Sequence, residues 1–180
     1  EEDIKKIKEE VFTYKSKNYI FDTNKEGQAL DTLNEILIRS CQKRLISDVP
    51  VGYFLSGGID SSLISAIIKK NLKKDIPAFT LADKVSGNLD FEYSQKISSF
   101  LKLNHYFFDV KDYKKSFCEI FENLSHYVDE PFADISTIST IILSREVKKK
   151  VKVVISGDGA DEMFGGYPKY NNIIYFLVAC

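Results

Sequence analysis

Cysteine is scarce in this chain of 180 residues, and charge of neither sign predominates. The three cysteines, Cys41, Cys118 and Cys180, lie far apart and form no CxxC pair, which argues against a disulfide framework and against a zinc module. The 25 Lys and Arg residues nearly balance the 26 Asp and Glu residues, so no overall basic field exists to hold nucleic acid or an anionic membrane surface. We therefore expect a reducing compartment, and neither nucleic acid nor a membrane as partner.

Neither end of the chain carries a recognisable signal peptide or membrane span. The start has no basic segment followed by an apolar stretch and a cleavage site, so no signal peptide is predicted and the cytoplasm is expected. The chain begins at Glu1 and ends inside the apolar run 173–179, which is far shorter than the roughly 20 apolar residues of a membrane span. We expect a fragment of a larger protein, truncated at its C-terminus; the alternative is an apolar terminus docked on the core.

The hydrophobic pattern indicates one domain at 27–180, preceded by a peripheral segment at 1–26. The hydrophobic content of 44% is enough to bury one sizeable core. Residues 27–46 carry an apolar stripe typical of an amphipathic helix with one buried face. The stripe consists of Leu30, Leu33, Leu37, Cys41 and Leu45.

Short apolar runs and helical segments then alternate along the chain. Strands are predicted at 51–55, 76–81, 105–110 and 151–155. Helices are predicted around the apolar body 63–68, which we expect to be covered on more than one face, and at 91–101, 112–127 and 135–149. This order predicts a doubly wound α/β fold, a mainly parallel sheet with helices on both faces.

Two glycine-rich segments follow predicted strands, at the sheet edge where such folds bind ligands. The first, SGGIDSS at 56–62, combines glycines, hydroxyls and a helix N-terminus, which together suit an anion. It lacks the lysine of a P-loop and the spacing of a dinucleotide fingerprint. Asp60 would repel phosphate unless Mg²⁺ bridged the two. The alternative is a tight turn in which Asp60 is the helix N-cap.

The second segment, SGDGADEMFGGY at 156–167, follows the fourth predicted strand and holds three acids within five residues. Asp161 is a natural second ligand for the same magnesium ion. The alternative is an ordinary solvated acidic loop.

Together these segments resemble a known family. SGGIDSS is similar to the pyrophosphate loop of the ATP pyrophosphatases. Three further stretches narrow the resemblance to the synthetase domain of the glutamine-dependent asparagine synthetases. They are SDVPVG at 47–52, DEPFAD at 129–134 and the second glycine segment. The resemblance covers residues 27–180 and implies an adenine nucleotide alpha hydrolase-like fold.

The resemblance implies an enzyme that uses ATP and Mg²⁺. A substrate carboxylate, aspartate in the first instance, attacks the α-phosphorus, pyrophosphate leaves, and ammonia displaces AMP from the acyl-adenylate. Asp60 and Asp161 would hold the metal and, with Asp158, make up the catalytic set. Pyrophosphate would be held by Ser56, Gly57, Gly58, Asp60, Ser61 and Ser62. Adenosine would be held by the backbone at Phe54 and Leu81 together with Ser156 and Gly157. Tyr167 would lie on the substrate side or, alternatively, pack under the glycine loop.

Asp158 departs from the family pattern, because many members carry Glu there. The shorter side chain leaves open another acceptor, as in amidotransferases of surface-polysaccharide or natural-product pathways. Two other classes also stay open: a pyrophosphate-loop enzyme that modifies tRNA, which the charge balance disfavours, and a non-catalytic nucleotide-binding module. The oligomeric state, a homodimer included, is open too.

Two parts of the family's machinery are missing from the chain. These are the glutaminase domain with its N-terminal cysteine and a phosphate-binding lysine beyond the second glycine loop, so the isolated fragment is expected to turn over poorly or not at all. Cys41 and Cys118 fall at helical core positions and are interpreted as packing residues. His105 and His126 have no partner at ligand spacing and are interpreted as structural.

Overall fold

The computed structural model describes residues 26–84, 89–130, 134, 136–168 and 170. The chain divides into two compact units, Glu1–Ile36 and Leu37–Cys180. The first is described only from Glu26, where helix α2 (Glu26–Arg44) begins. The predicted peripheral segment, the middle of the DEPFAD motif and the apolar run 173–179 lie outside the described residues. The domain boundary at 26/27 therefore stays a prediction.

Helix α2 confirms the predicted helix but not the full burial of its stripe. Cys41, near the C-terminal end, is buried, whereas Leu30 is 59% exposed. Leu33, Leu37 and Leu45 are half-buried. The prediction of a buried stripe is wrong at Leu30 in the described structure.

A four-stranded parallel sheet forms the centre of the second unit. Its strands are β1 (Val51–Phe54), β2 (Ala78–Ala82), β3 (His105–Asp109) and β4 (Val153–Ile155). They lie in the order β3-β2-β1-β4, and each neighbouring pair is parallel. The predicted α/β class and parallel sheet are confirmed.

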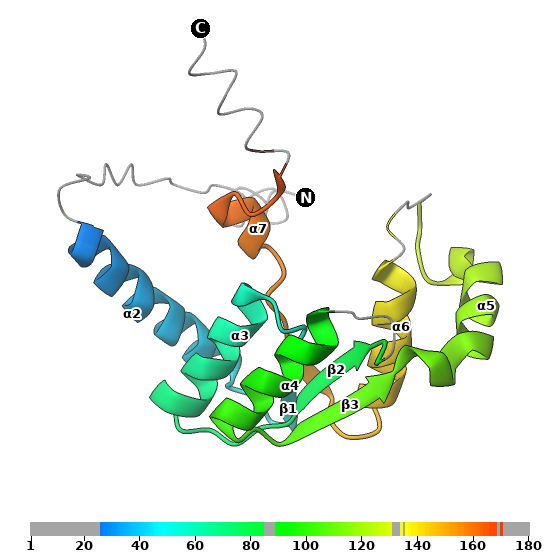
Figure 1. Cartoon of the computed structure of the whole chain (residues 1–180), viewed down its shortest axis with the longest axis horizontal. Helices are drawn as coiled ribbons and strands as arrows, with labels where there is room; N and C mark the ends of the chain where they lie inside the picture. The colour runs from blue at the N-terminus through cyan, green and yellow to red at the C-terminus, as the bar shows by residue number, and fades with distance from the viewer. Residues whose placement is uncertain (1–25, 85–88, 131–133, 135, 169, 171–180) are drawn as a thin grey trace, which may run out of the picture. The chain divides into compact units, whose positions relative to one another are not determined.

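Helices pack on both faces of the sheet (Figure 1). Helix α3 (Ile59–Ala66), its π-helical continuation η2 (Ile67–Asn71) and α4 (Leu89–Leu101) cover one face. Helix α6 (Ser136–Val147) covers the other and packs against α5 (Lys114–Glu122). Strands β1, β2 and β4 contribute to both cores, as the two-residue period of a strand allows: Tyr53 packs with Ile68 and Ala78, while Phe54 packs against Phe79 and Val147.

Three expectations about the helices need correction. The predicted helix 112–127 is instead a 3₁₀ turn η3 (Val110–Tyr113), α5 and a second 3₁₀ turn η4 (Leu124–His126). Asn123 ends α5 because its side-chain amide donates to the Glu119 carbonyl at 2.8 Å. The body 63–68 is covered on more than one face, since Ser65, Ile67 and Ile68 are all buried, but not at Leu63, which is 43% exposed. Cys118 is exposed rather than buried.

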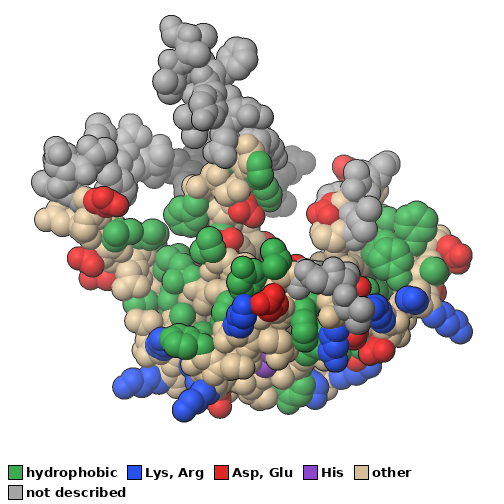
Figure 2. Space-filling view, in the orientation of Figure 1, with side chains coloured by type: hydrophobic (Ala, Val, Ile, Leu, Met, Phe, Trp, Pro, Cys, Tyr) green, Lys and Arg blue, Asp and Glu red, His purple; other side chains and the backbone are tan. Residues whose placement is uncertain are grey.

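Lysines stand at both ends of the strands of the second unit. Lys73 and Lys74 precede β2 and Lys102 precedes β3, while Lys84 follows β2 and Lys111 follows β3. Figure 2 shows Lys and Arg side chains spread over the lower half of the view. The glycine-rich segments, with their acids, follow β1 and β4.

None of the helices in the described part of the chain is long and apolar enough to cross a membrane.

Candidate functional site

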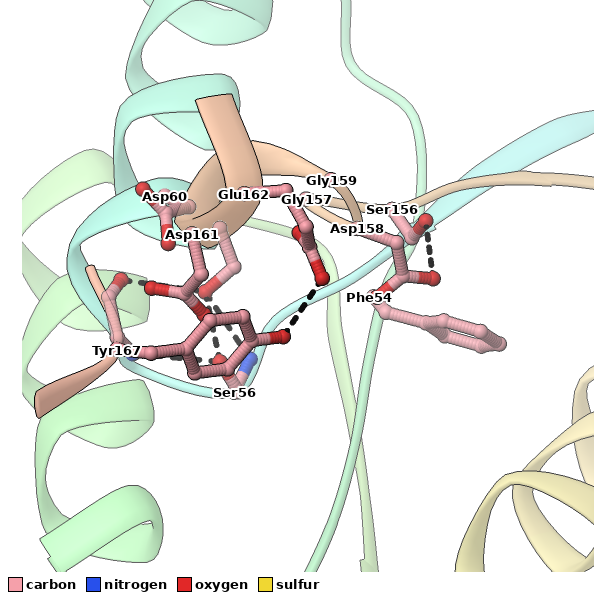
Figure 3. A pocket seen from close by; sticks show the side chains of 12 residues that line it. Phe54, Ser56, Asp60, Ser156, Gly157, Asp158, Gly159, Asp161, Glu162 and Tyr167 are labelled. Carbon is pink, nitrogen blue, oxygen red and sulfur yellow. Dashed lines mark hydrogen bonds between the residues drawn. The ribbon is translucent and has the colours of Figure 1, made fainter. Parts of the chain in front are cut away.

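A cavity of about 440 Å³ lies between the segments that follow β1 and β4. These strands are neighbours in the sheet, and the chain leaves β1 toward β2 on one side but returns to β4 on the other. The cavity thus lies at the point where the strand order reverses, the usual ligand site of this architecture. Figure 3 shows its lining: Phe54, Ser56, Gly58, Asp60, Ser61, Ser156, Gly157, Asp158, Gly159, Asp161, Glu162 and Tyr167.

Hydroxyl groups brace the first loop at the N-terminus of α3. Ser56 Oγ lies 3.0 Å from Ser61 Oγ, and the Ser56 amide donates to Ser61 Oγ at 3.2 Å. Ser61 Oγ also bonds the Gly58 carbonyl at 3.2 Å. The first amides of a helix have no intrahelical partner and favour an anion. The loop therefore presents helix amides at one end of the cavity, and the two hydroxyls hold its shape.

Asp60 does not cap α3. The N-cap is Gly58, without a side-chain cap hydrogen bond, and Asp60 is the second helical residue. Its side chain lines the cavity beside Asp161 (Figure 3). The interpretation of Asp60 as a helix cap is wrong.

Gly57 shapes the loop without lining the cavity. Its φ of +88° is a conformation that side chains disfavour. A Cβ there would lie 2.7 Å from the Ser94 backbone nitrogen and 2.9 Å from Tyr93 Cβ, both in α4. Gly57 lets the loop pack directly against α4, and its predicted part in binding pyrophosphate stays a prediction. Ser62, whose hydroxyl donates to the Gly58 carbonyl, is also outside the lining.

The second glycine segment packs against the first. A Cβ on Gly157 would lie 3.2 Å from Asp60 Cβ and 3.4 Å from the Ser61 nitrogen. The segment contains a short helix that the sequence did not predict, α7 (Ala160–Phe164), between Gly159 and Gly165, both with positive φ. A Cβ on Gly166 would overlap Oδ1 of Asp161. Glycines thus bring the two acidic segments together and leave room for the Asp161 carboxylate.

The other polar groups of the second segment are paired. Ser156 Oγ donates to Asp158 Oδ2 at 2.8 Å, and Asp158 lies on the Phe54 side of the site (Figure 3). The Tyr167 hydroxyl donates to Glu162 Oε1 at 2.8 Å, and this hydrogen bond to the carboxylate raises the pKa of Tyr167 to about 12. Tyr167 therefore lines the cavity as a neutral donor.

The cavity is acidic. Its lining includes the carboxylates of Asp60, Asp158, Asp161 and Glu162, and no Lys or Arg belongs to the described lining. Within the described residues, no group of three or more His, Cys, Asp or Glu side chains could hold a metal ion. A polyanionic ligand would therefore need to bring a cation with it.

A second hollow of about 210 Å³ adjoins the first and shares Phe54, Ser56 and Asp158 with it. Leu81 lines this hollow rather than the main cavity. The remainder of its lining is more apolar and includes three hydroxyl residues of α6 that sequence reasoning missed, Ser136, Ser139 and Thr140.

Most of the predicted site residues meet around these two spaces. Gly57 and Ser62 are the exceptions among them. Glu162 and Gly159 were missed, although they stand within the second motif. The α6 hydroxyls follow the DEPFAD motif, which could have drawn attention to them. His105 is half-buried and His126 exposed, and neither lines either space.

Comparisons with known proteins agree with this architecture. Residues 32–176 match the family model "Asparagine synthase". The chain is 31% identical over 158 residues to glutamine-hydrolysing asparagine synthetase 1 of Bacillus subtilis, covering 88% of the chain and 24% of the relative. It is 33% identical over 139 residues to glutamine-hydrolysing asparagine synthetase 3 of Arabidopsis thaliana, covering 69% and 23%. The chain thus spans about a quarter of the length of these relatives.

A solved structure shares the fold at low sequence identity. The NH3-dependent NAD synthetase of Campylobacter jejuni superposes with a TM-score of 0.54 at 19% identity, over 76% of this chain and 60% of that one. The family match favours the asparagine synthetase interpretation over the tRNA-modifying alternative. The chain belongs to the asparagine synthase family.

Proposed function

We propose that this chain is the nucleotide-binding part of an amidotransferase that adenylylates a carboxylate with ATP and then forms an amide with ammonia. The observation that carries the proposal is the cavity at the strand reversal, where hydroxyls and helix amides face carboxylates from a second loop. A site for an inorganic anion alone would not need these acids. An ATP–magnesium complex needs both kinds of group.

In this proposal the first loop receives the β- and γ-phosphates. Charge builds up on the pyrophosphate as the bond between the α-phosphorus and the bridging oxygen breaks. The amides at the start of α3 would neutralise part of that charge. The hydroxyls of Ser56 and Ser61 hold the loop in shape instead, because Ser61 Oγ donates to the Gly58 carbonyl and the Ser56 hydroxyl donates to Ser61 Oγ.

Asp60 and Asp161 are the residues that would hold magnesium. Carboxylate oxygens are hard ligands of the kind Mg²⁺ takes, and one or two of them suffice when phosphates supply the others. Bound there, the metal would neutralise phosphate charge. Gly157 packs against Asp60 and Gly166 packs against Asp161. Because these glycines have no side chains, both carboxylates fit in the same small space.

The adjoining hollow is the proposed adenosine site. Phe54 and Leu81 offer apolar surface, and Phe54 lines both spaces. Ser156 and Gly157, also expected to hold adenosine, line the phosphate cavity. Apolar walls with a few polar groups are typical of small-ligand sites. Ser139 and Thr140 of α6 also line this hollow, and the Thr140 hydroxyl donates to the Ser136 carbonyl at 3.0 Å.

Aspartate is the acceptor that we favour. Its carboxylate oxygen would attack the α-phosphorus, and ammonia would then attack the acyl carbon, lose a proton and expel AMP. Asp158 stands at the junction of the two spaces, where the α-phosphorus would lie. Its short side chain, held by Ser156, favours as second candidate an amidotransferase with a bulkier acceptor. In the whole protein, a glutaminase domain would supply the ammonia, and the cytoplasm is the compartment such a reaction implies.

Three variants test the proposal. Asp60→Ala and Asp161→Ala should each abolish magnesium-dependent ATP binding in calorimetric titrations and leave AMP binding nearly intact. Asp48→Ala is the matched control, because Asp48 is exposed and precedes β1 at the opposite end of that strand. Equal loss of ATP and AMP binding in Asp60→Ala would mean that Asp60 supports the fold rather than the metal.

A further inference from the structure

Strand β1 stops pairing with β2 one residue before the first loop begins. The paired register ends with Phe54 opposite Phe79. Leu55, the next residue, is buried, and its amide still donates to the Phe79 carbonyl at 2.9 Å. Its carbonyl accepts a hydrogen bond from the Thr80 hydroxyl. A side chain thus holds the carbonyl at the point where the backbone turns away toward the cavity.

Thr80 has a second partner, His105 of β3. Thr80 is only 2% exposed, and its Oγ1 lies 2.8 Å from His105 Nε2. A hydroxyl has one proton, and a carbonyl oxygen can only accept. Because that proton goes to Leu55, the Thr80 oxygen must accept from His105. Nε2 of His105 therefore carries a proton.

The protonation state of the other ring nitrogen, Nδ1, follows from the burial of His105. Burial lowers the pKa of His105 below its ordinary value, so the ring is neutral at neutral pH. A neutral imidazole has one N–H. The expected state of His105 is therefore the tautomer with a proton on Nε2 and none on Nδ1.

The hydrogen bonds continue from Leu55 into the loop. The Leu55 carbonyl and the Ser56 N–H belong to one planar peptide group, so fixing the carbonyl fixes the direction of the N–H. That N–H donates to Ser61 Oγ at 3.2 Å, and Ser61 in turn bonds Gly58. A continuous path leads from His105 on β3 to the helix N-terminus at the cavity.

We propose that Thr80 and His105 are positioning residues of this site: His105 donates to Thr80, and Thr80 donates to the Leu55 carbonyl and so orients the peptide that opens the loop 56–62. Neither residue contacts the proposed phosphates, but Thr80 also lines the hollow proposed for adenosine, so the loop signals rather than the nucleotide affinity decide its positioning role. The inference rests on the proposed function for its consequence, nucleotide affinity, but the hydrogen bonds themselves can be tested without nucleotide.

The first measurement is the tautomer of His105 in the unmodified chain. Long-range ¹H–¹⁵N spectra distinguish protonated from unprotonated ring nitrogens, and the chain has only two histidines. The exposed His126 serves as internal reference. We expect a protonated Nε2 and an unprotonated Nδ1 for His105 at neutral pH; the opposite tautomer would overturn the inference.

The second measurement compares Thr80→Val with Thr80→Ser, and His105→Leu with His105→Gln. Valine and leucine remove the donors, whereas serine and glutamine restore a hydroxyl and an Nε2 donor. We expect the backbone amide signals of Ser56, Gly57 and Gly58 to move in Thr80→Val and His105→Leu and to return in the conservative variants. In Thr80→Val and His105→Leu, the affinity for ATP with magnesium should fall about fivefold, which is the usual contribution of one hydrogen bond. It should recover in Thr80→Ser and His105→Gln.

The outcomes separate the two proposals. Loop signals that stay in place in a folded Thr80→Val chain would overturn the positioning role, whatever the nucleotide affinity. Absence of magnesium-dependent ATP binding by the unmodified chain would count against the proposed function, while the tautomer and loop signals would still decide the positioning role.

Discussion

At the scale of single residues, neighbouring glycines of the first loop have different tasks. Gly57 has a positive φ and a backbone neighbour in α4 where a Cβ would be, whereas Gly58 has φ −66° and only Ser56 Oγ, at 3.4 Å. Gly58 lines the cavity and Gly57 does not. The sequence motif alone treats the two as equivalent, because it records composition and not backbone conformation.

Gly57→Ala should therefore destabilise the fold far more than Gly58→Ala. The unfavourable φ alone costs about 1–3 kcal/mol, and the overlap with α4 adds to it, while Gly58→Ala should change the unfolding free energy by less than about 1 kcal/mol. Urea denaturation of both variants measures the difference. Equal midpoints would refute the role given to Gly57.

His105 should make stability depend on pH. Since burial lowers its pKa, the unfolded chain binds a proton on this ring near its ordinary pKa of about 6.5, whereas the folded chain does not. The contribution is fully present above that pH and is lost as the pH falls toward the folded-state pKa. Urea titrations at a series of pH values should therefore show a free energy of unfolding that decreases as the pH falls below about 6.5.

His105→Gln removes this ionisation and should flatten that decrease, with His126→Gln as the control that keeps it. An unchanged slope in His105→Gln would assign the pH dependence to other groups.

At the scale of elements, hydrophobic periodicity predicted the strands and helices well. The four strands appear within two residues of their predicted bounds, and α4 and α6 nearly so. The misses arise from local polar chemistry. Asp109 accepts from the Lys111 amide at 3.0 Å and starts the 3₁₀ turn η3 where one long helix was expected. Such side-chain hydrogen bonds to the backbone leave no periodic signal.

Helix α6 should depend on its buried isoleucines. Ile142 is 2% exposed and packs in a cluster with Ile120 of α5 and Ile138. Ile142→Ala should lower the unfolding free energy by about 2–5 kcal/mol through lost burial and a cavity. The matched change Ile59→Ala, at a residue 86% exposed, should stay within about 0.5 kcal/mol. Similar losses in both variants, measured by urea denaturation, would contradict the packing described for α6.

At the scale of the whole molecule, the sequence predicted which loops form the site because parallel strands present their carboxyl ends at one edge. The sequence could not predict which role each residue has within the site. Each role depends on which side chains face the cavity, as with Asp158, which turns toward Ser156 and Phe54. It also depends on contacts between distant segments, such as Gly157 against Asp60.

The acidic cavity leads to the central claim, that the site binds ATP only together with magnesium. Its described lining holds four carboxylates and no basic side chain, so we expect a metal ion to compensate most of the nucleotide charge. The adjoining hollow is expected to select adenine over guanine.

The most direct test is a calorimetric titration of ATP into the chain with and without magnesium, beside GTP. We predict that ATP binds in the presence of magnesium. Binding should be at least about tenfold weaker, a difference of about 1.4 kcal/mol, when magnesium is removed or GTP replaces ATP. Equal affinity with and without magnesium, or no ATP binding by a folded chain, would contradict this prediction.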